Sequence, residues 1–330
     1  VDLPDDPAPS VQMYLIRALS PTLYDPDLTR YLITTSRSPH PGVAAAAVDK
    51  LVETGTRNYR VIRTLLDSAR SGNPYAIEPI VWIGDRRSIP DLEAIFQQED
   101  HGPLKRASFL ALENMGAPYI GRKEVVCAWM PAPPRIDGHL GLEEWKAATP
   151  IREFAADRDG APLDLALTAR VAYDSTRFYL SLVCEAPDTH PPAVQIGLRD
   201  DGEIQNDDHI EWAFFTSREP AIPYVFAVTP LGAIQERKGA DPTWNPAWSA
   251  SLIREPNRWT VECAIPLSSL GFEAGGPIPP LRFNIALVSG RPPFRRWAWS
   301  VTYDSPHNPD RFGDMSFETT PSNRGNTNHE

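Results

Sequence analysis

Two hydrophobic patterns divide this chain of 330 residues. Between residues 10 and 125, apolar positions recur at helical spacing; the stretch from Tyr59 to Ala69 has them at 61, 62, 65, 66 and 69. From Arg135 onward, apolar and polar residues alternate with the two-residue period of a strand, as in 165–173 and 259–265. These periods are typical of amphipathic helices and half-buried strands. The sequence therefore predicts a multidomain α + β protein.

The helical part contains a repeat. Segments 42–55 and 59–69 form a first pair, 74–84 and 89–96 a second, and 103–116 begins a third. Gly55, Gly84 and Gly116 close the first helix of each pair at spacings of 29 and 32 residues. A period of this length is typical of stacked helical hairpins. The pattern is similar to short HEAT-like repeats and predicts an α-solenoid, with 10–37 as a degenerate first repeat. A plain helical bundle is the alternative.

The second part has the pattern of a sandwich. Short alternating runs are separated by Pro, Gly, Asn and Asp, and the chain holds 35 prolines, which favour turns and strand ends. We expect an antiparallel β-sandwich of jelly-roll or immunoglobulin-like type. The predicted domains are residues 1–130, residues 131–320 and a flexible tail at 321–330, with 130–134 as a stiff proline-rich linker.

An ordered series of segments between residues 134 and 318 resembles a known family. The segments are 136–138 with Trp145, 171–174, 178–181, 206–212, 259–266, 281–285 and 311–317. Their order resembles the family 9 carbohydrate-binding module and its relatives in the DOMON-like superfamily. The resemblance implies a domain that binds sugars, or in some relatives haem, and performs no chemistry. It also implies a structural calcium ion and a periplasmic or extracellular location, and Trp145 as a core aromatic.

The resemblance and the residue chemistry together give candidate sugar-binding residues. Glu211 matches the family glutamate that accepts hydrogen bonds from sugar hydroxyls, and a carboxylate can accept two at once. The binding members carry a Trp shortly before this segment, where the present chain has Gln205 and no aromatic. Aromatic faces and guanidinium groups supply the other expected contacts. These are Trp244, Trp248, Arg295 with its neighbour Arg296, Trp297 and Trp299.

Acidic loops supply the candidate calcium ligands, because Ca²⁺ prefers oxygen donors. The main cluster lies within nine residues and comprises Asp200, Asp201, Glu203, Asp207 and Asp208. A second, looser cluster comprises Asp304, Asn308 and Asp310. Neither has the spacing of an EF-hand loop.

Charge, hydropathy and cysteine spacing limit which partners, membrane segments and disulfides are expected. Net charge is −11, with 18 basic against 27 acidic residues after position 130, so a phosphate backbone would be repelled and no nucleic-acid partner is expected. No apolar run reaches the roughly 18 residues that a membrane span requires. Cys127, Cys184 and Cys263 have no metal spacing; buried free thiols are expected, and a Cys184–Cys263 disulfide is the alternative.

The leading functional hypothesis is a non-catalytic carbohydrate-binding protein, with the helical repeat as a scaffold that docks another protein. The alternative is a haem-binding or ligand-free structural subunit of an exported complex. An enzyme is not expected, because no nucleophile elbow, phosphate loop or marked carboxylate pair is present.

Overall fold

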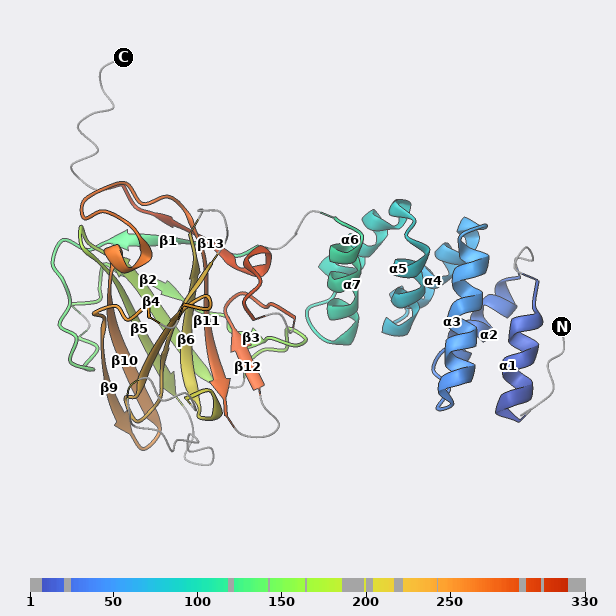
Figure 1. The fold of residues 1–330 in the computed structure, drawn as a ribbon, viewed down its shortest axis with the longest axis horizontal. Coiled ribbons are helices and arrows are strands. Elements are labelled where there is room, and N and C mark those ends of the chain that lie inside the picture. The colour runs from blue at the N-terminus through green and yellow to red at the C-terminus, as the bar shows by residue number, and fades with distance from the viewer. Residues whose placement is uncertain are drawn as a thin grey trace, which may run out of the picture. The chain divides into compact units, whose positions relative to one another are not determined.

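The computed structural model describes residues 8–20, 25–117, 122–141, 143–163, 165–185, 199, 204–216, 222–241, 243–290, 295–303 and 306–319. The chain divides into two compact units, Val1–Ile120 and Gly121–Glu330 (Figure 1). The division falls before the boundary predicted at residue 130, because the strand Glu124–Trp129 pairs with strands of the second unit.

The first unit is helical in the described residues. α1 packs on α3, α3 on α5, and α5 on α7, whereas α2 packs on α4 and α4 on α6. Odd- and even-numbered helices therefore form two layers, as stacked hairpins do. Membership of the HEAT-like repeats stays a prediction. The helices are α1 (Pro9–Ala18), α2 (Pro26–Thr35), α3 (Pro41–Gly55), α4 (Tyr59–Arg70), α5 (Ile77–Ile83), α6 (Ile89–Gln98) and α7 (Pro103–Asn114), with short 3₁₀ turns at Pro74–Ala76 and Arg86–Ser88.

Local sequence explains where these helices begin and end. Asp25 accepts hydrogen bonds from the backbone N–H groups of Asp27 and Leu28, which caps α2. Asn58 caps α4 by accepting from Arg60 N. Gly84 ends α5 with φ +69°, a left-handed conformation that favours glycine. The amphipathic pattern of 59–69 is confirmed, since its five apolar positions are buried in α4.

The second unit is a two-layered β structure. One layer runs β8-β7-β6-β11-β13, with β12 and β3 attached, and the other runs β4-β5-β10-β9, with β2 attached. Their facing sides form the main core. The strands are β1 (Glu124–Trp129), β2 (Thr149–Ile151), β3 (Ala155–Ala156), β4 (Ala166–Tyr173), β5 (Arg177–Glu185), β6 (His209–Phe215), β7 (Pro223–Val228), β8 (Ile234–Lys238), β9 (Ser249–Glu255), β10 (Arg258–Pro266), β11 (Leu281–Ser289), β12 (Arg295–Ala298) and β13 (Gly313–Phe317), with 3₁₀ turns at Ile204–Asn206, Leu267–Leu270 and Pro309–Arg311.

β1 joins the two layers and departs from the antiparallel prediction. It pairs in parallel with β13 through residues 124–127 and in parallel with β4 through Ala128 and Trp129. The sheet is therefore mixed, and one edge of the sandwich is closed. The other pairings between these strands are antiparallel, as expected.

The opening segment of the β unit is held by a buried carboxylate. Glu262 on β10 is fully buried. It accepts hydrogen bonds from Gly138 N at 2.7 Å, Asp137 N at 3.0 Å and Trp145 Nε1 at 2.7 Å. Gly138 has φ +87°, and a Cβ there would press on the backbone of β9. The expectation that Trp145 is a core aromatic is confirmed, since it is 3% exposed.

The strand register excludes the disulfide alternative. Cys184 lies opposite Trp259 and Cys263 lies opposite Leu180, so the two cysteines are four residues apart along paired strands. That offset exceeds the reach of a disulfide. All three cysteines are buried free thiols. Within the described ranges, no helix has the length and apolarity needed to cross a membrane.

Candidate functional site

Successive side chains of β6 point to opposite faces of its sheet. Ile210, Trp212 and Phe214 belong to the main core between the layers. His209 and Glu211 therefore point to the opposite, outer side of the sheet. β11 lies beside β6, with Ala286 opposite Glu211 and Val288 opposite His209. β12 follows beyond β11 with Arg296 opposite Val288, which places the arginine on the same outer face.

Glu211 is the centre of a charged network on this outer face. Its Oε1 atom lies 2.8 Å from Arg296 Nη1 and 3.2 Å from His307 Nε2. Its Oε2 atom lies 3.7 Å from Arg237 Nη2 on β8, beyond ordinary hydrogen-bond distance. The Glu211 side chain is only 5% exposed, whereas those of Arg237 and His307 are 49% and 33% exposed. Arg237 and His307 therefore carry this network to the surface.

Asp157 holds the other side of Arg296. Its Oδ2 atom lies 3.2 Å from Arg296 Nε and accepts a hydrogen bond of 2.7 Å from Thr302 Oγ1. The backbone N–H of Asp157 donates to Arg296 O at 2.7 Å. The guanidinium of Arg296 thus lies between two buried carboxylates, which fixes its plane and directs it at Glu211.

Residues 299–303 and 306–312 contact this face of the sheet and bring His307 to it. Asn284 on β11 donates to Ser300 O at 2.7 Å and accepts from Ser300 N at 2.9 Å. At the other end Phe312 packs on Phe215 of β6, with ring centroids 5.2 Å apart. Tyr303, between them, has φ 49°, a conformation that is costly for a side chain with a Cβ.

Electrostatics keep Glu211 ionised despite its burial. Burial alone would raise the pKa of this carboxyl, but the Arg296 charge and the His307 hydrogen bond outweigh it, so the pKa lies well below its ordinary value. Burial lowers the pKa of neighbouring His209, whose Nδ1 lies 2.8 Å from Asp207 O. At neutral pH the face therefore presents an anionic carboxylate framed by cations.

The predicted aromatic residues are buried in the main core or packed against it. Trp248 is 4% exposed and Trp299 is 5% exposed, and both belong to the main core. Their rings have no free face for a sugar, so burial does not support a stacking role for either. Trp248 Nε1 donates to Glu236 Oε2 at 2.7 Å, which fixes it inside the sandwich.

Trp244 and Trp297 are half-buried and pack against the same core. The Trp244 ring contacts Tyr224 and Phe226 edge-on, with centroids 5.5 Å away in each case. Trp297 and exposed Arg295 alternate with Arg296 along β12, so they face away from Glu211. The structure therefore does not bring the predicted set together around Glu211.

Three residues of the observed network were missed by the sequence prediction. Arg237, His307 and Asp157 join Glu211 and Arg296 only through the fold. The one local signal was the alternation of β6, which places Glu211 opposite to Trp212. His307 is 96 residues from Glu211 along the chain, and no short motif spans that distance.

The predicted calcium ligands are only partly described. Asp200, Asp201 and Glu203 lie outside the described residues, as does Asp304 of the second cluster. Asp207 is 3% exposed, and Asp208 accepts a hydrogen bond of 2.9 Å from Gly290 N. Among the residues that the structure describes, no group of three or more His, Cys, Asp or Glu side chains could hold a metal ion. A calcium site here stays a prediction.

Comparisons with known proteins return distant similarity in fold. No family model and no curated protein matches this chain. A family 9 carbohydrate-binding module from Caldicellulosiruptor kristjanssonii, solved with cellotriose, is 13% identical, with a TM-score of 0.45 over 61% of this chain and 96% of the module. Its complex with glucose gives 15% identity and a TM-score of 0.44 over 60% and 97%.

A third solved structure, a candidate carbohydrate-binding protein from Bacteroides uniformis, is 15% identical with a TM-score of 0.48 over 60% of this chain and all of that protein. At these identities and TM-scores the likenesses do not carry a function to this chain.

Proposed function

We propose that the β unit is a non-catalytic carbohydrate-binding domain, with its ligand at the outer face of β6, β8 and β12. The observation that carries the proposal is the ionised, nearly buried Glu211 framed by Arg296, Arg237 and His307. A sugar hydroxyl both donates and accepts hydrogen bonds, so a carboxylate oxygen next to guanidinium and imidazole N–H groups matches it.

The two oxygens of Glu211 have different roles in this proposal. Oε1 is occupied by Arg296 and His307, which fix the carboxylate. Oε2 is 3.7 Å from its nearest cation and keeps acceptor capacity for a hydroxyl. The half-exposed guanidinium of Arg237 would donate to the neighbouring hydroxyl. Trp244, Trp297 and Arg295 remain proposed contributors at the edges of the sandwich.

The test is a glycan array that includes glucose and cello-oligosaccharides, followed by calorimetry with the strongest hit. Arg237→Ala and His307→Ala should each weaken binding about tenfold, because the first removes a charged donor to the ligand and the second removes a hydrogen bond that fixes Glu211. Arg254→Ala, an exposed arginine on edge strand β9, is the matched control and should bind as the parent does. Equal binding by the Arg237 and Arg254 variants would place the ligand elsewhere.

The same array, run with calcium and with EDTA, tests the proposed structural ion. Loss of binding in EDTA, restored by calcium, is the expected result.

A visible absorption spectrum of the purified protein tests the haem alternative, and product analysis of the bound oligosaccharide tests the proposal that the domain is not an enzyme. Export, which we also propose, is tested by fractionating the source cells.

A ligand-free structural role is the second candidate. It is favoured by the burial of Trp248 and Trp299 and by the occupation of Glu211 Oε1 by groups of the protein itself. In that case the network would serve only to fix residues 299–303 and 306–312 on the sheet. Absence of binding across the array, with and without calcium, would support this role over the first.

For the helical unit we propose a docking function. Its seven described helices stack in two layers and leave connecting turns along each edge, which is how helical repeats present surfaces to other proteins. This proposal is independent of sugar binding.

A further inference from the structure

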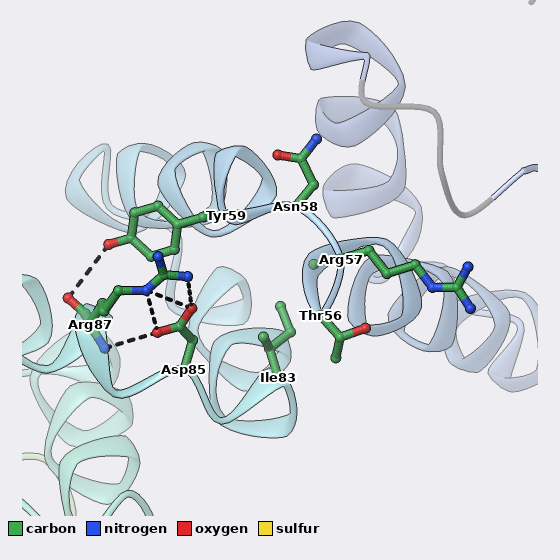
Figure 2. Close-up of a pocket in the computed structure, with 8 residues that line it drawn as sticks. Thr56, Arg57, Asn58, Tyr59, Ile83, Asp85 and Arg87 are labelled. Atoms are coloured by element: carbon green, nitrogen blue, oxygen red, sulfur yellow. Dashed lines mark hydrogen bonds and ion pairs between the residues drawn. The ribbon is translucent and has the colours of Figure 1, made fainter.

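A pocket of about 300 Å³ opens between two successive turns of the helical unit. One turn joins α3 to α4 and contributes Gly55 to Tyr59, and the other joins α5 to α6 and contributes Asp85 and Arg87. Ile83 lies between them and takes the space that a side chain at Gly55 would need. Figure 2 shows Arg87 and Tyr59 on one side of this pocket and Arg57 on the other.

One wall of the pocket is fixed in place. The Arg87 guanidinium lies over the Tyr59 ring, 4.3 Å from its centroid. Arg87 Nε donates to both oxygens of Asp85, at 2.9 and 3.1 Å, and Tyr59 Oη reaches Arg87 O at 3.5 Å (Figure 2). The ion pair holds the pKa of the Asp85 carboxyl below its ordinary value, mainly through the Arg87 hydrogen bond. Asp85 therefore stays ionised and keeps Arg87 oriented.

The rest of the lining offers hydrogen-bond donors. Arg57 is exposed, and its guanidinium makes no hydrogen bond or ion pair with another described residue, although its charge contributes to lowering the pKa of Glu53 on α3. Asn58 uses its Oδ1 atom to cap α4, which leaves its amide N–H groups toward solvent. Arg87 Nη1 is not engaged by Asp85. Free donors on three residues make this pocket suited to an anion.

The charge of these turns contrasts with that of the chain. Residues 56–60 and 84–88 hold four arginines and one aspartate, in a protein of net charge −11. Packed helices lie about 8–10 Å apart, which is close to three residues of a polyproline II chain at about 3.1 Å each. A peptide in this conformation returns its side chains to the same side every third residue, so one running along this edge would meet one turn with every third side chain.

We infer that this pocket is the docking site for an acidic peptide segment of a partner protein, with glutamate or aspartate at a spacing of three residues. The inference rests on the docking role proposed for the helical unit and specifies its location and partner chemistry. One carboxylate meets Arg57, a second one three residues away meets Arg87, and the peptide backbone crosses over Asn58 between them.

The experiment uses the full chain and a fluorescein-labelled peptide of four Glu-Ser-Ser repeats, followed by anisotropy at 50 mM NaCl. Arg57→Glu should weaken binding at least tenfold, because one donor becomes a like charge. Arg63→Glu, an equally exposed arginine on α4 outside the pocket, is the matched control and should change it less than twofold. Binding should also weaken at 500 mM NaCl, where exposed charges are screened.

A second variant tests the pocket itself. Thr56→Trp fills it without changing charge and should abolish binding, while thermal unfolding shows that both variants keep the fold. Equal losses in the Arg57 and Arg63 variants would mean a diffuse charge effect and overturn the inference. So would full binding by the Thr56 variant, no binding by the parent protein, or stronger binding of inorganic phosphate than of the peptide. Sugar binding by the same samples reports separately on the β unit.

Discussion

The two sheets of the β unit each bury a glutamate, and the two carboxylates are satisfied in opposite ways. Glu262 on β10 accepts from two backbone N–H groups and the Trp145 indole. Glu211 on β6 lies between the guanidinium groups of Arg296 and Arg237, with the His307 imidazole at hydrogen-bond distance. Burial raises the pKa of Glu262, and its hydrogen bonds only partly offset this. At Glu211 the cations outweigh burial and lower the pKa.

The difference separates a structural carboxylate from a candidate functional one. The partners of Glu262 are neutral dipoles of a segment that must be held down, and none of them reaches solvent with a charge. Two partners of Glu211, Arg237 and His307, are partly exposed, so the network ends at a surface where a ligand can meet it. A strongly perturbed ionised group at such a surface is a site candidate.

The largest effect should come from removing the central cation. Arg296→Met leaves both Glu211 and Asp157 buried without their shared partner, which should lower the free energy of unfolding by about 3–5 kcal/mol. Urea denaturation followed by tryptophan fluorescence measures it. Arg295→Met, an exposed residue at the start of the same strand, is the control and should change stability by less than about 0.5 kcal/mol. Similar losses in both variants would contradict the network described here.

Glu262→Leu should cost about 2–4 kcal/mol, because two backbone N–H groups and one indole N–H lose their acceptor in a buried site. Glu262→Gln keeps one acceptor oxygen and should cost about half as much. Hydrogen exchange at Gly138 should rise in the leucine variant. Unchanged protection at Gly138 would show that Glu262 does not hold the opening segment.

A smaller loss should follow when Trp248 is replaced by Phe. The substitution keeps most of the apolar contact with Phe226 but removes the N–H that donates to buried Glu236, which should cost about 1–2 kcal/mol. Trp244→Phe lacks such a partner in the described structure and serves as the comparison. Thermal unfolding of the two variants should therefore separate a core tryptophan from one at the edge.

The pH dependence of stability should differ in sign between the two glutamates. The folded pKa of Glu211 lies below its ordinary value of 4.5, so its contribution is present above pH 4.5 and is lost as pH falls through the folded value. The folded pKa of Glu262 lies above 4.5, so its contribution is complete below pH 4.5 and is lost as pH rises through that value.

Comparing each Glu→Gln variant with the parent between pH 3 and 8 should show these opposite slopes, on the order of 1 kcal/mol. The stability difference between parent and Glu211→Gln should shrink toward pH 3, and that for Glu262→Gln should shrink toward pH 8. Slopes of the same sign would contradict the contrast between the two carboxylates.

The sequence by itself determined the division of the chain and the nature of each part. Apolar residues recur every 3.6 residues before position 125 and every two residues after position 135, which specifies the apolar face of each element. Burial of those faces requires paired helices in the first part and a sandwich in the second. The alternation of β6 also separates Glu211 from Trp212. These are local properties, read within one element.

Only the tertiary structure decided which polar groups meet. Arg296 and His307 reach Glu211 from 85 and 96 residues away, and Asp157 reaches Thr302 across 145. The same packing buried Trp248 and Trp299. Their local sequence was compatible with the surface as well as with the core. Because β1 pairs in parallel with strands of both layers, even the closed edge of the sandwich depends on contacts that no local pattern records.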